Sequence, residues 1–299
     1  MNARSWAMIL LLALPGGGSF LFYRILAPII PPLSVVTARF VFGLVAVSLL
    51  LFFVRIDWFA TARRWRQLAI MVLMNGAIPF YIYAIVAVRV PAGLMAILNA
   101  TTPLFALLIT RVIAGEKITP ARAAGFAFGF LGVAVLVAPK LLAGGMSAEI
   151  TDALLCLLCA FLFASGATYA VQIKGLHPVA INFSQCLMCS ILLLPATLAV
   201  DQPWTLPDPG LLGWFALLTI GMVSTGLATV GFFMLLPKIG ASNALLINFL
   251  VPVYAILMGW AVLGETLSLA AFAGMALIAL GLAAIDGRAF AWLRGRVAG

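Results

Sequence analysis

The sequence has little charge and almost no histidine. Only 8% of its 299 residues are charged, with eight acidic residues and a single histidine, His177. Soluble domains carry about a quarter charged residues, so this composition excludes an ordinary soluble protein. Enzymes embedded in membranes need a nucleophile with its base, or carboxylates with a metal, and no such group lies in or beside the apolar segments. We therefore expect no enzyme activity, no catalytic residues and no cofactor.

Cysteine is also scarce, with only the pairs Cys156-x-x-Cys159 and Cys186-x-x-Cys189. In a soluble protein this spacing would suggest a zinc site. Both pairs lie inside apolar segments with no carboxylate nearby, which favours buried cysteines that act as small hydrophobic side chains. We expect no metal ligands.

Basic residues exceed acidic ones and give a formal net charge of +9. In a soluble protein this excess would suggest a nucleic-acid partner, but Lys and Arg of membrane proteins collect in cytoplasmic loops. Most of the basic residues here fall at alternate ends of the apolar segments. This pattern predicts that both termini are cytosolic, and we expect no nucleic-acid partner.

Long hydrophobic runs dominate the chain. Hydrophobic residues make up 65% of it and the mean hydropathy is +1.23. Lipid accepts only helices or closed barrels, and these runs are too long and alternate too little to be barrel strands. The first run resembles a secretory signal, but its length favours a retained helix. The sequence predicts an all-α membrane protein with ten transmembrane helices, at 5–26, 32–54, 67–88, 91–114, 119–139, 151–173, 178–200, 209–235, 241–263 and 267–286.

One stretch of sequence, Ala92–Ala134, recurs 149 positions later as Ala241–Ala283 without a gap, which indicates an internal repeat. Weaker matches align 32–39 with 178–185 and 75–77 with 224–226. Ten helices give five per half, and an odd number forces the second copy to be inverted. We predict two five-helix repeats around a central cavity, 1–145 and 146–299, the second ending in a short basic cytosolic tail.

Each half carries a proline, about a dozen apolar residues, a Gly-Glu pair and a helix with glycines seven residues apart. The most specific elements are Pro103 with Gly115-Glu116, and Pro252 with Gly264-Glu265. In these features the whole chain resembles the EamA-type branch of the drug/metabolite transporter superfamily. The resemblance implies a ten-helix carrier of the bacterial inner membrane that works by alternating access. It also suggests export of amino acids, aromatic ones among them, or of related metabolites.

Polar residues inside the predicted spans are the candidate substrate-binding residues, because a polar group in hydrocarbon is costly unless it faces a partner. Asn99 and Asn248 occupy equivalent positions four residues before the prolines, where they would contact substrate, bond the backbone carbonyls that proline frees, or do both. Tyr81 and Tyr83 cannot share a helix face, and we favour Tyr83 for the cavity. The remaining candidates are Asn75, Tyr169, Gln185 and Ser224.

Arg39 is the only charge well inside a predicted span, which makes it a further substrate-binding candidate. It would hold a substrate carboxylate, tie carbonyls of a broken helix together, or extend along the helix to the membrane surface. Pro103 and Pro252 are candidate hinges, with static kinks as the alternative. Glu116 and Glu265 fall at helix junctions, where a structural role beside a helix N-terminus is favoured over proton coupling and Thr119 or Ser268 would cap the next helix.

These patterns together predict a secondary transporter. It would export amino acids or related small metabolites by facilitated diffusion or exchange, because no acidic residue or histidine lies at mid-membrane for proton coupling. The expected partners are a small-molecule substrate and the lipid bilayer, with no obligatory protein partner evident. The alternatives are a proton-coupled drug or metabolite exporter and a channel.

Overall fold

A computed structural model describes residues 3–114, 124–125, 127–135, 148–170, 173, 175–239 and 246–286. Every regular element within these ranges is helical, as predicted. Six helices are long and apolar enough to cross a membrane: Ala7–Leu26, Pro32–Phe53, Trp65–Val86, Glu149–Tyr169, Pro178–Val200 and Gly210–Phe232. Three shorter apolar helices are Ala92–Ala106, Leu250–Leu263 and Leu269–Gly281. The fifth predicted span is only partly inside the described residues.

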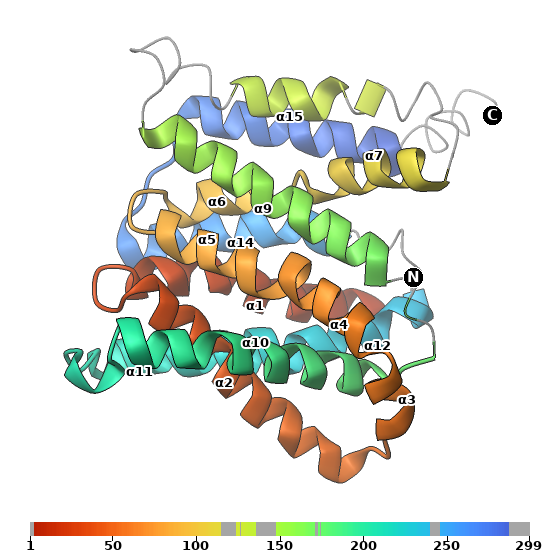
Figure 1. Ribbon diagram of the computed structural model, residues 1–299. Coiled ribbons are helices and arrows are strands. Elements are labelled where there is room, and N and C mark those ends of the chain that lie inside the picture. Colours follow the sequence, from red (N-terminus) through yellow and green to blue (C-terminus); the bar gives the residue numbers. More distant parts are fainter. Residues whose placement is uncertain are drawn as a thin grey trace.

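The helices lie side by side across a single bundle (Figure 1). In the first half they are α1 (Ala3–Leu26), α2 (Pro32–Leu50), η1 (Leu51–Phe53), α3 (Trp58–Arg63), α4 (Trp65–Val72), η2 (Leu73–Ala77), α5 (Ile78–Val86), α6 (Ala92–Asn99) and α7 (Thr102–Ala114). In the second half they are α9 (Ala148–Ala170), α10 (Pro178–Val200), η3 (Pro203–Thr205), α11 (Gly210–Leu218), η4 (Thr219–Ala228), α12 (Thr229–Ile239), α14 (Leu246–Leu263) and α15 (Leu269–Asp286).

Large apolar side chains cover the outer faces of these helices. Leu211 is 90% exposed, and Ile191 and Leu192 on α10 are exposed as well. A soluble protein rarely leaves so many large apolar side chains in contact with water, whereas lipid tails solvate them. The outward faces therefore agree with a bundle that spans a membrane.

The fourth predicted helix is not continuous, and in this respect the prediction of one helix over 91–114 is wrong. The regular α-helix α6 ends at Asn99, Ala100 and Thr101 form a turn, and α7 begins at Thr102. Pro103 has no N–H for the Asn99 carbonyl, and the Thr102 hydroxyl donates to that oxygen instead at 2.6 Å. The Thr101 hydroxyl donates likewise to the Leu98 carbonyl at 2.7 Å. Two threonines thus satisfy the carbonyls at the break.

Two other spans are interrupted by π-helical turns. The segment η2 separates α4 from α5, and η4 separates α11 from α12. The two segments overlap when the chain is shifted by 149 positions, so they occupy equivalent places in the two halves. Such turns insert extra backbone into a helix, loosen its hydrogen-bond ladder, and occur often at functional sites.

Two pairs of equivalent segments pack against each other in antiparallel directions. On α2 and α10, the Thr37 and Thr197 hydroxyl oxygens lie 2.6 Å apart, and Gly43 faces Cys186 further along. The segment 124–135 and α15 lie together at one edge of the bundle (Figure 1). A Cβ on Gly132 would come within 2.6 Å of the Gly274 carbonyl oxygen, and one on Gly281 within 2.5 Å of the Gly125 carbonyl oxygen.

Candidate functional site

Side-chain amides of α10 hold both π-helical segments from the middle of the bundle. Gln185 Nε2 donates to the Asn75 carbonyl in η2 at 2.8 Å. Asn182, which is fully buried, donates from Nδ2 to the carbonyls of Thr225 and Gly226 in η4, at 2.9 and 3.0 Å. One neighbouring helix therefore donates side-chain hydrogen bonds to backbone oxygens of both π-helical segments.

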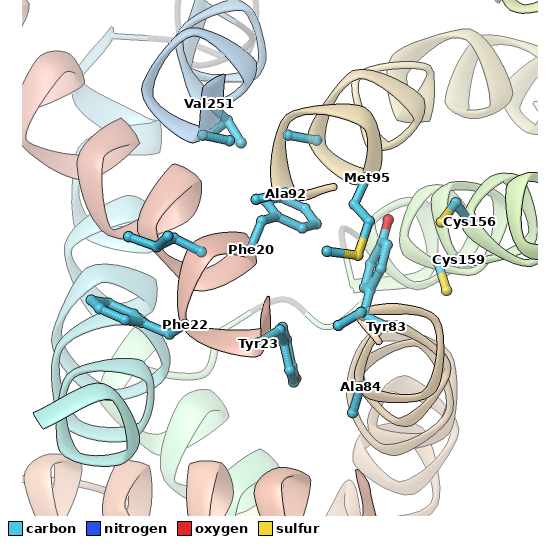
Figure 2. Packing of buried hydrophobic residues seen from close by; sticks show 14 of the residues in the cluster. Phe20, Phe22, Tyr23, Tyr83, Ala84, Ala92, Met95, Cys156, Cys159 and Val251 are labelled. Carbon is cyan, nitrogen blue, oxygen red and sulfur yellow. The ribbon is translucent and has the colours of Figure 1, made fainter. Parts of the chain in front are cut away.

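The candidates Tyr83 and Asn99 form a direct pair. The Tyr83 hydroxyl donates to Asn99 Oδ1 at 3.0 Å, and Tyr83 is 1% exposed. Its ring packs edge-on against Phe20, with centroids 5.2 Å apart, and stacks with Phe163 at 6.1 Å. Figure 2 shows Tyr83 rising from α5 beside Met95 of α6. Tyr81 is 38% exposed, which confirms that Tyr83 is the inward-facing tyrosine of the two.

Arg39 lies inside the bundle and is 4% exposed. Its guanidinium carbon Cζ is 3.9 Å from the centroid of the Phe80 ring and 5.6 Å from that of Tyr23. The guanidinium therefore does not extend to the membrane surface, and the interpretation that it does is wrong. Stacking on an aromatic face holds it in place, as the ring quadrupole attracts a cation.

Six side-chain polar atoms are buried without a hydrogen-bond partner in the described part of the chain. They are Arg39 Nε and Nη1, the Tyr23 hydroxyl, Gln67 Oε1, Gln185 Oε1 and the Ser190 hydroxyl. Arg39 thus donates to no carbonyl through Nε or Nη1, which removes the interpretation that these nitrogens tie broken-helix carbonyls together. Buried polar groups are nearly always satisfied, so a cluster of unsatisfied ones calls for a ligand or water.

The other candidates have contacts within the protein. Ser224 donates to the Pro15 carbonyl at 3.0 Å, which Ser19 also contacts at 2.9 Å. Tyr169 lies apart from the Tyr83–Asn99 pair, in a small cluster with Leu68, Met71, Ile173 and Ile181. Asn248 belongs to α14, but its side chain lies outside the described part of the structure.

The two candidate hinges differ. Pro103 stands at the second position of α7, directly after the break, whereas Pro252 lies inside the unbroken α14. At the positions equivalent to Thr101 and Thr102, this helix has Leu250 and Val251, which have no hydroxyl to satisfy a freed carbonyl.

Two ion pairs tie helix ends that the predicted orientation places outside. Glu265 Oε1 accepts from Arg24 Nε at 3.1 Å, while its Oε2 accepts from the Ala92 N–H, at the start of α6, at 2.9 Å. Asp152 accepts two hydrogen bonds from Arg89, at 2.7 and 2.8 Å, and these bonds raise the pKa of Arg89 above its ordinary value.

Glu265 thus contacts a helix N-terminus, as predicted, although this is the N-terminus of α6 and not of the following helix. Ser268 Oγ accepts from the Ala271 N–H at 3.2 Å and caps α15, which confirms that prediction. Glu116 and Thr119 lie outside the described residues. All four cysteines are free and fully buried, as predicted.

Three residues with contacts described above were not recognised from the sequence. Tyr23 and Phe80 lie beside the Arg39 guanidinium, and Asn182 donates to η4. Asn182 carried a detectable signal, because a carboxamide one turn from Gln185 in an apolar helix needs a partner. Tyr23 and Phe80 had none, since nothing in their local sequence distinguishes them from core aromatic residues.

Comparison with known proteins identifies this architecture. The model of the EamA-like transporter family matches twice, at residues 4–138 and 151–285. YoaV of Bacillus subtilis, described as an uncharacterized transporter, is 27% identical over 259 residues, which cover 85% of this chain and 86% of YoaV. The uncharacterized inner membrane transporter YedA of Escherichia coli is 27% identical over 180 residues, 60% of this chain and 57% of YedA.

A solved crystal structure shares the fold. It superposes with a TM-score of 0.64 at 18% sequence identity and covers 92% of this chain and 96% of its own. At that identity the likeness concerns the fold alone.

Proposed function

Because this chain belongs to the EamA-like transporter family, we propose that it is a secondary transporter that exports amino acids, including aromatic ones, or related small metabolites. The chain is a membrane transporter, and the names of its relatives indicate no enzyme. Our proposal adds the substrate class, the direction of transport, and alternating access with facilitated diffusion or exchange.

The reciprocal contacts between equivalent helices support an inverted pair of five-helix repeats. Gly132 meets Gly274 while Gly281 meets Gly125, so each half offers the other the same two positions in reverse order. Equivalent helices that run antiparallel are what inversion in the membrane plane produces. Inverted repeats of this kind carry the substrate site of secondary transporters near mid-membrane, between the halves.

The single observation that carries the proposal is the set of buried, unsatisfied polar atoms on α1, α2 and α10, helices that belong to both halves. Arg39 and Tyr23 come from one half and Gln185 and Ser190 from the other. Burying polar atoms without hydrogen-bond partners lowers the stability of the folded protein, so folding alone gives no explanation for them. A polar solute that binds between the halves would satisfy these atoms. By binding one conformation better than the other, it would shift the equilibrium between two arrangements of the halves.

The location we propose is the inner membrane of a bacterium, with both termini in the cytosol. YedA is named an inner membrane transporter, and its likeness to this chain supports that membrane. The distribution of basic residues supports the orientation. In this orientation the pairs Arg24–Glu265 and Arg89–Asp152 tie helices at the outer surface.

Counterflow in proteoliposomes tests the proposal. The purified chain is reconstituted, the vesicles are loaded with one unlabelled amino acid, and uptake of the labelled form is followed for a panel that includes aromatic amino acids. We expect exchange that needs no pH gradient. Absence of solute-dependent flux across the whole panel would refute the exporter, and flux only under a pH gradient would refute the uncoupled mechanism.

A Tyr83→Phe variant provides the matched substitution for this assay. It removes the hydroxyl that donates to Asn99 and keeps the ring that packs on Phe20 and Phe163. Lower flux with unchanged expression supports a place in the substrate site. The Tyr81→Phe variant is the control, because Tyr81 is exposed on the outer face.

A further inference from the structure

The guanidinium of Arg39 is a buried cation for which the described protein provides no counter-ion. Carboxylates with described contacts are held elsewhere: Glu265 by Arg24, Asp152 by Arg89, Asp201 by Ser34, Asp57 by the N-terminus of α3, and Asp208 by Trp214. Burying an unpaired charge is costly, and cation–π contact with the rings offsets only part of this cost. Within the described residues, the site therefore lacks an anion.

The free donors point to the chemistry of that anion. Arg39 Nε and Nη1 are both unused, and so is the buried Tyr23 hydroxyl, whose ring lies beside the guanidinium. The Nε–H and Nη1–H groups lie on different sides of the planar guanidinium, and each can donate a charge-assisted hydrogen bond to an anionic oxygen such as that of a carboxylate. We infer that Arg39 binds the carboxylate of the transported solute, with Tyr23 as a second donor.

The surroundings of Arg39 indicate what else the solute carries. Phe80, under the guanidinium, packs against Phe40 with ring centroids 5.8 Å apart and against Phe163 at 5.2 Å. Phe163 in turn stacks on Tyr83. This row of rings runs from the cation to the Tyr83–Asn99 pair, so an aromatic or apolar group on the carboxylate would find a complementary surface.

The described residues offer no negative charge for an ammonium group, because the unused acceptor Gln185 Oε1 is neutral. Within the described residues, no carboxylate contacts Arg39, Tyr23 or Phe80. The site is therefore a monocarboxylate site that tolerates the α-amino group of an amino acid without requiring it, and it rejects amines that have no carboxylate. The identification of the bound carboxylate with the transported solute rests on the proposed function. Carboxylate binding at Arg39 can be measured without transport.

Thermal unfolding of the purified full chain in detergent tests the site with four matched compounds. They are 3-phenylpropionate, phenylalanine, phenylalanine amide and phenethylamine, which share the ring and differ in the carboxylate and amine. We expect the first two to raise the unfolding temperature and the last two to leave it unchanged. Equal stabilisation by the amide or the amine would overturn the inference.

Arg39→Gln and Arg39→Met separate a ligand-binding role from a structural one. Each removes an unpaired buried charge, so without ligand both variants should unfold at the same temperature as the parent or higher. Their apparent affinity for 3-phenylpropionate should fall at least about tenfold, the loss of one charge-assisted contact. Variants that unfold earlier and still respond to the carboxylate would show a purely structural arginine and refute the inference.

Arg63→Gln is the control. Arg63 also lies over a phenyl ring, that of Phe59 at 5.1 Å, but it is exposed at the end of α3, so the response to ligand should not change. Chloride is titrated as a separate arm. If chloride stabilises the parent as much as 3-phenylpropionate does, the site holds an inorganic anion and the inference fails. Carboxylate binding without counterflow would keep the inference about the site and refute the transport proposal instead.

Discussion

The helices that carry the two repeated prolines differ in continuity. On one side, α6 and α7 meet at a break beside Pro103, and on the other, α14 runs unbroken through Pro252. Both sequences place an asparagine four residues before the proline. The difference lies in the last two of the three residues between them, Thr101 and Thr102 against Leu250 and Val251, because threonine hydroxyls can satisfy carbonyls at a break and aliphatic side chains cannot.

A second pair of equivalent positions differs in a similar way. Gln185 and Arg39 align in the repeat. Arg39 lies on α2 and Gln185 on α10, the second long helix of each half. Gln185 Nε2 has a backbone partner in η2, whereas Arg39 Nε and Nη1 have none in the described chain. Equivalent positions can thus differ, with a backbone partner for the amide nitrogen of Gln185 and none for these two nitrogens of Arg39.

The contact where the two halves are most alike should be the most sensitive to substitution. Gly132→Ala and Gly281→Ala would each drive a methyl group into a backbone carbonyl of the facing helix. We expect each to lower the free energy of unfolding by about 3 kcal/mol or more, and by similar amounts, because overpacking against backbone cannot relax by a rotamer change. Denaturant titration in detergent micelles measures this.

Gly18→Ala is the control for both glycine variants. Its Cβ would meet only the Phe22 ring at 3.4 Å and the Met258 side chain, so the change should be neutral or slightly stabilising in the helix. A loss at Gly132 much smaller than at Gly281 would contradict the reciprocity of the contact.

The two side-chain amides of α10, Asn182 and Gln185, should differ in how much stability their removal costs, according to the number of hydrogen bonds that each donates. Asn182→Ala removes two side-chain hydrogen bonds to carbonyls of η4 and should cost about 2–3 kcal/mol, while Gln185→Ala removes one to a carbonyl of η2 and should cost about 1–2 kcal/mol. The same titration compares them. The reverse order would mean that η4 holds its shape without α10.

Thr102→Val makes the break beside Pro103 resemble the unbroken helix. It removes the hydroxyl that satisfies the Asn99 carbonyl with little change in shape, and it should cost about 1 kcal/mol. Thr205→Val is the matched control, because Thr205 donates at 2.8 Å to the carbonyl three residues earlier but is exposed to solvent. Equal losses in the two variants would indicate that the proline break needs no hydroxyl.

The smallest effect is expected at Ser224. Ser224→Ala removes one of two hydroxyls on the Pro15 carbonyl and should cost less than about 0.5 kcal/mol, since Ser19 remains. The double variant Ser19→Ala with Ser224→Ala should lose more than the two single losses together, because only then is that carbonyl left without a hydroxyl donor. Strict additivity would show that the hydroxyls act independently.

Much of the fold can be predicted from the sequence, because the positions of prolines and the lengths of the apolar segments indicate where helices begin and end. Residues 178–200 were predicted as a helix and α10 has the same bounds. The break at 100–101 and the two π segments were not predicted, because they arise from competition between backbone and side-chain donors that hydropathy does not register. Helical periodicity predicted that Tyr81 and Tyr83 lie on different faces, and Tyr83 is the buried one of the two.

The interior position of Arg39 was harder to predict. Seven residues from the start of a span, an arginine side chain is long enough to reach the surface, and only the position of Phe80 on another helix decides against it. Tertiary aromatic contacts of this kind are set by helix packing, which the sequence of one segment does not contain.

Because all four native thiols are buried, the natural chain can serve as the unlabelled reference when membrane topology is mapped with thiol reagents. Because Cys156, Cys159, Cys186 and Cys189 have no exposed surface, a reagent that cannot cross the bilayer should leave the natural protein unmarked. A single cysteine introduced at the exposed Thr205 or Arg63 would then report which side of the membrane it faces. If the termini are cytosolic, whole cells should label the first position and inverted vesicles the second, with no native cysteine removed.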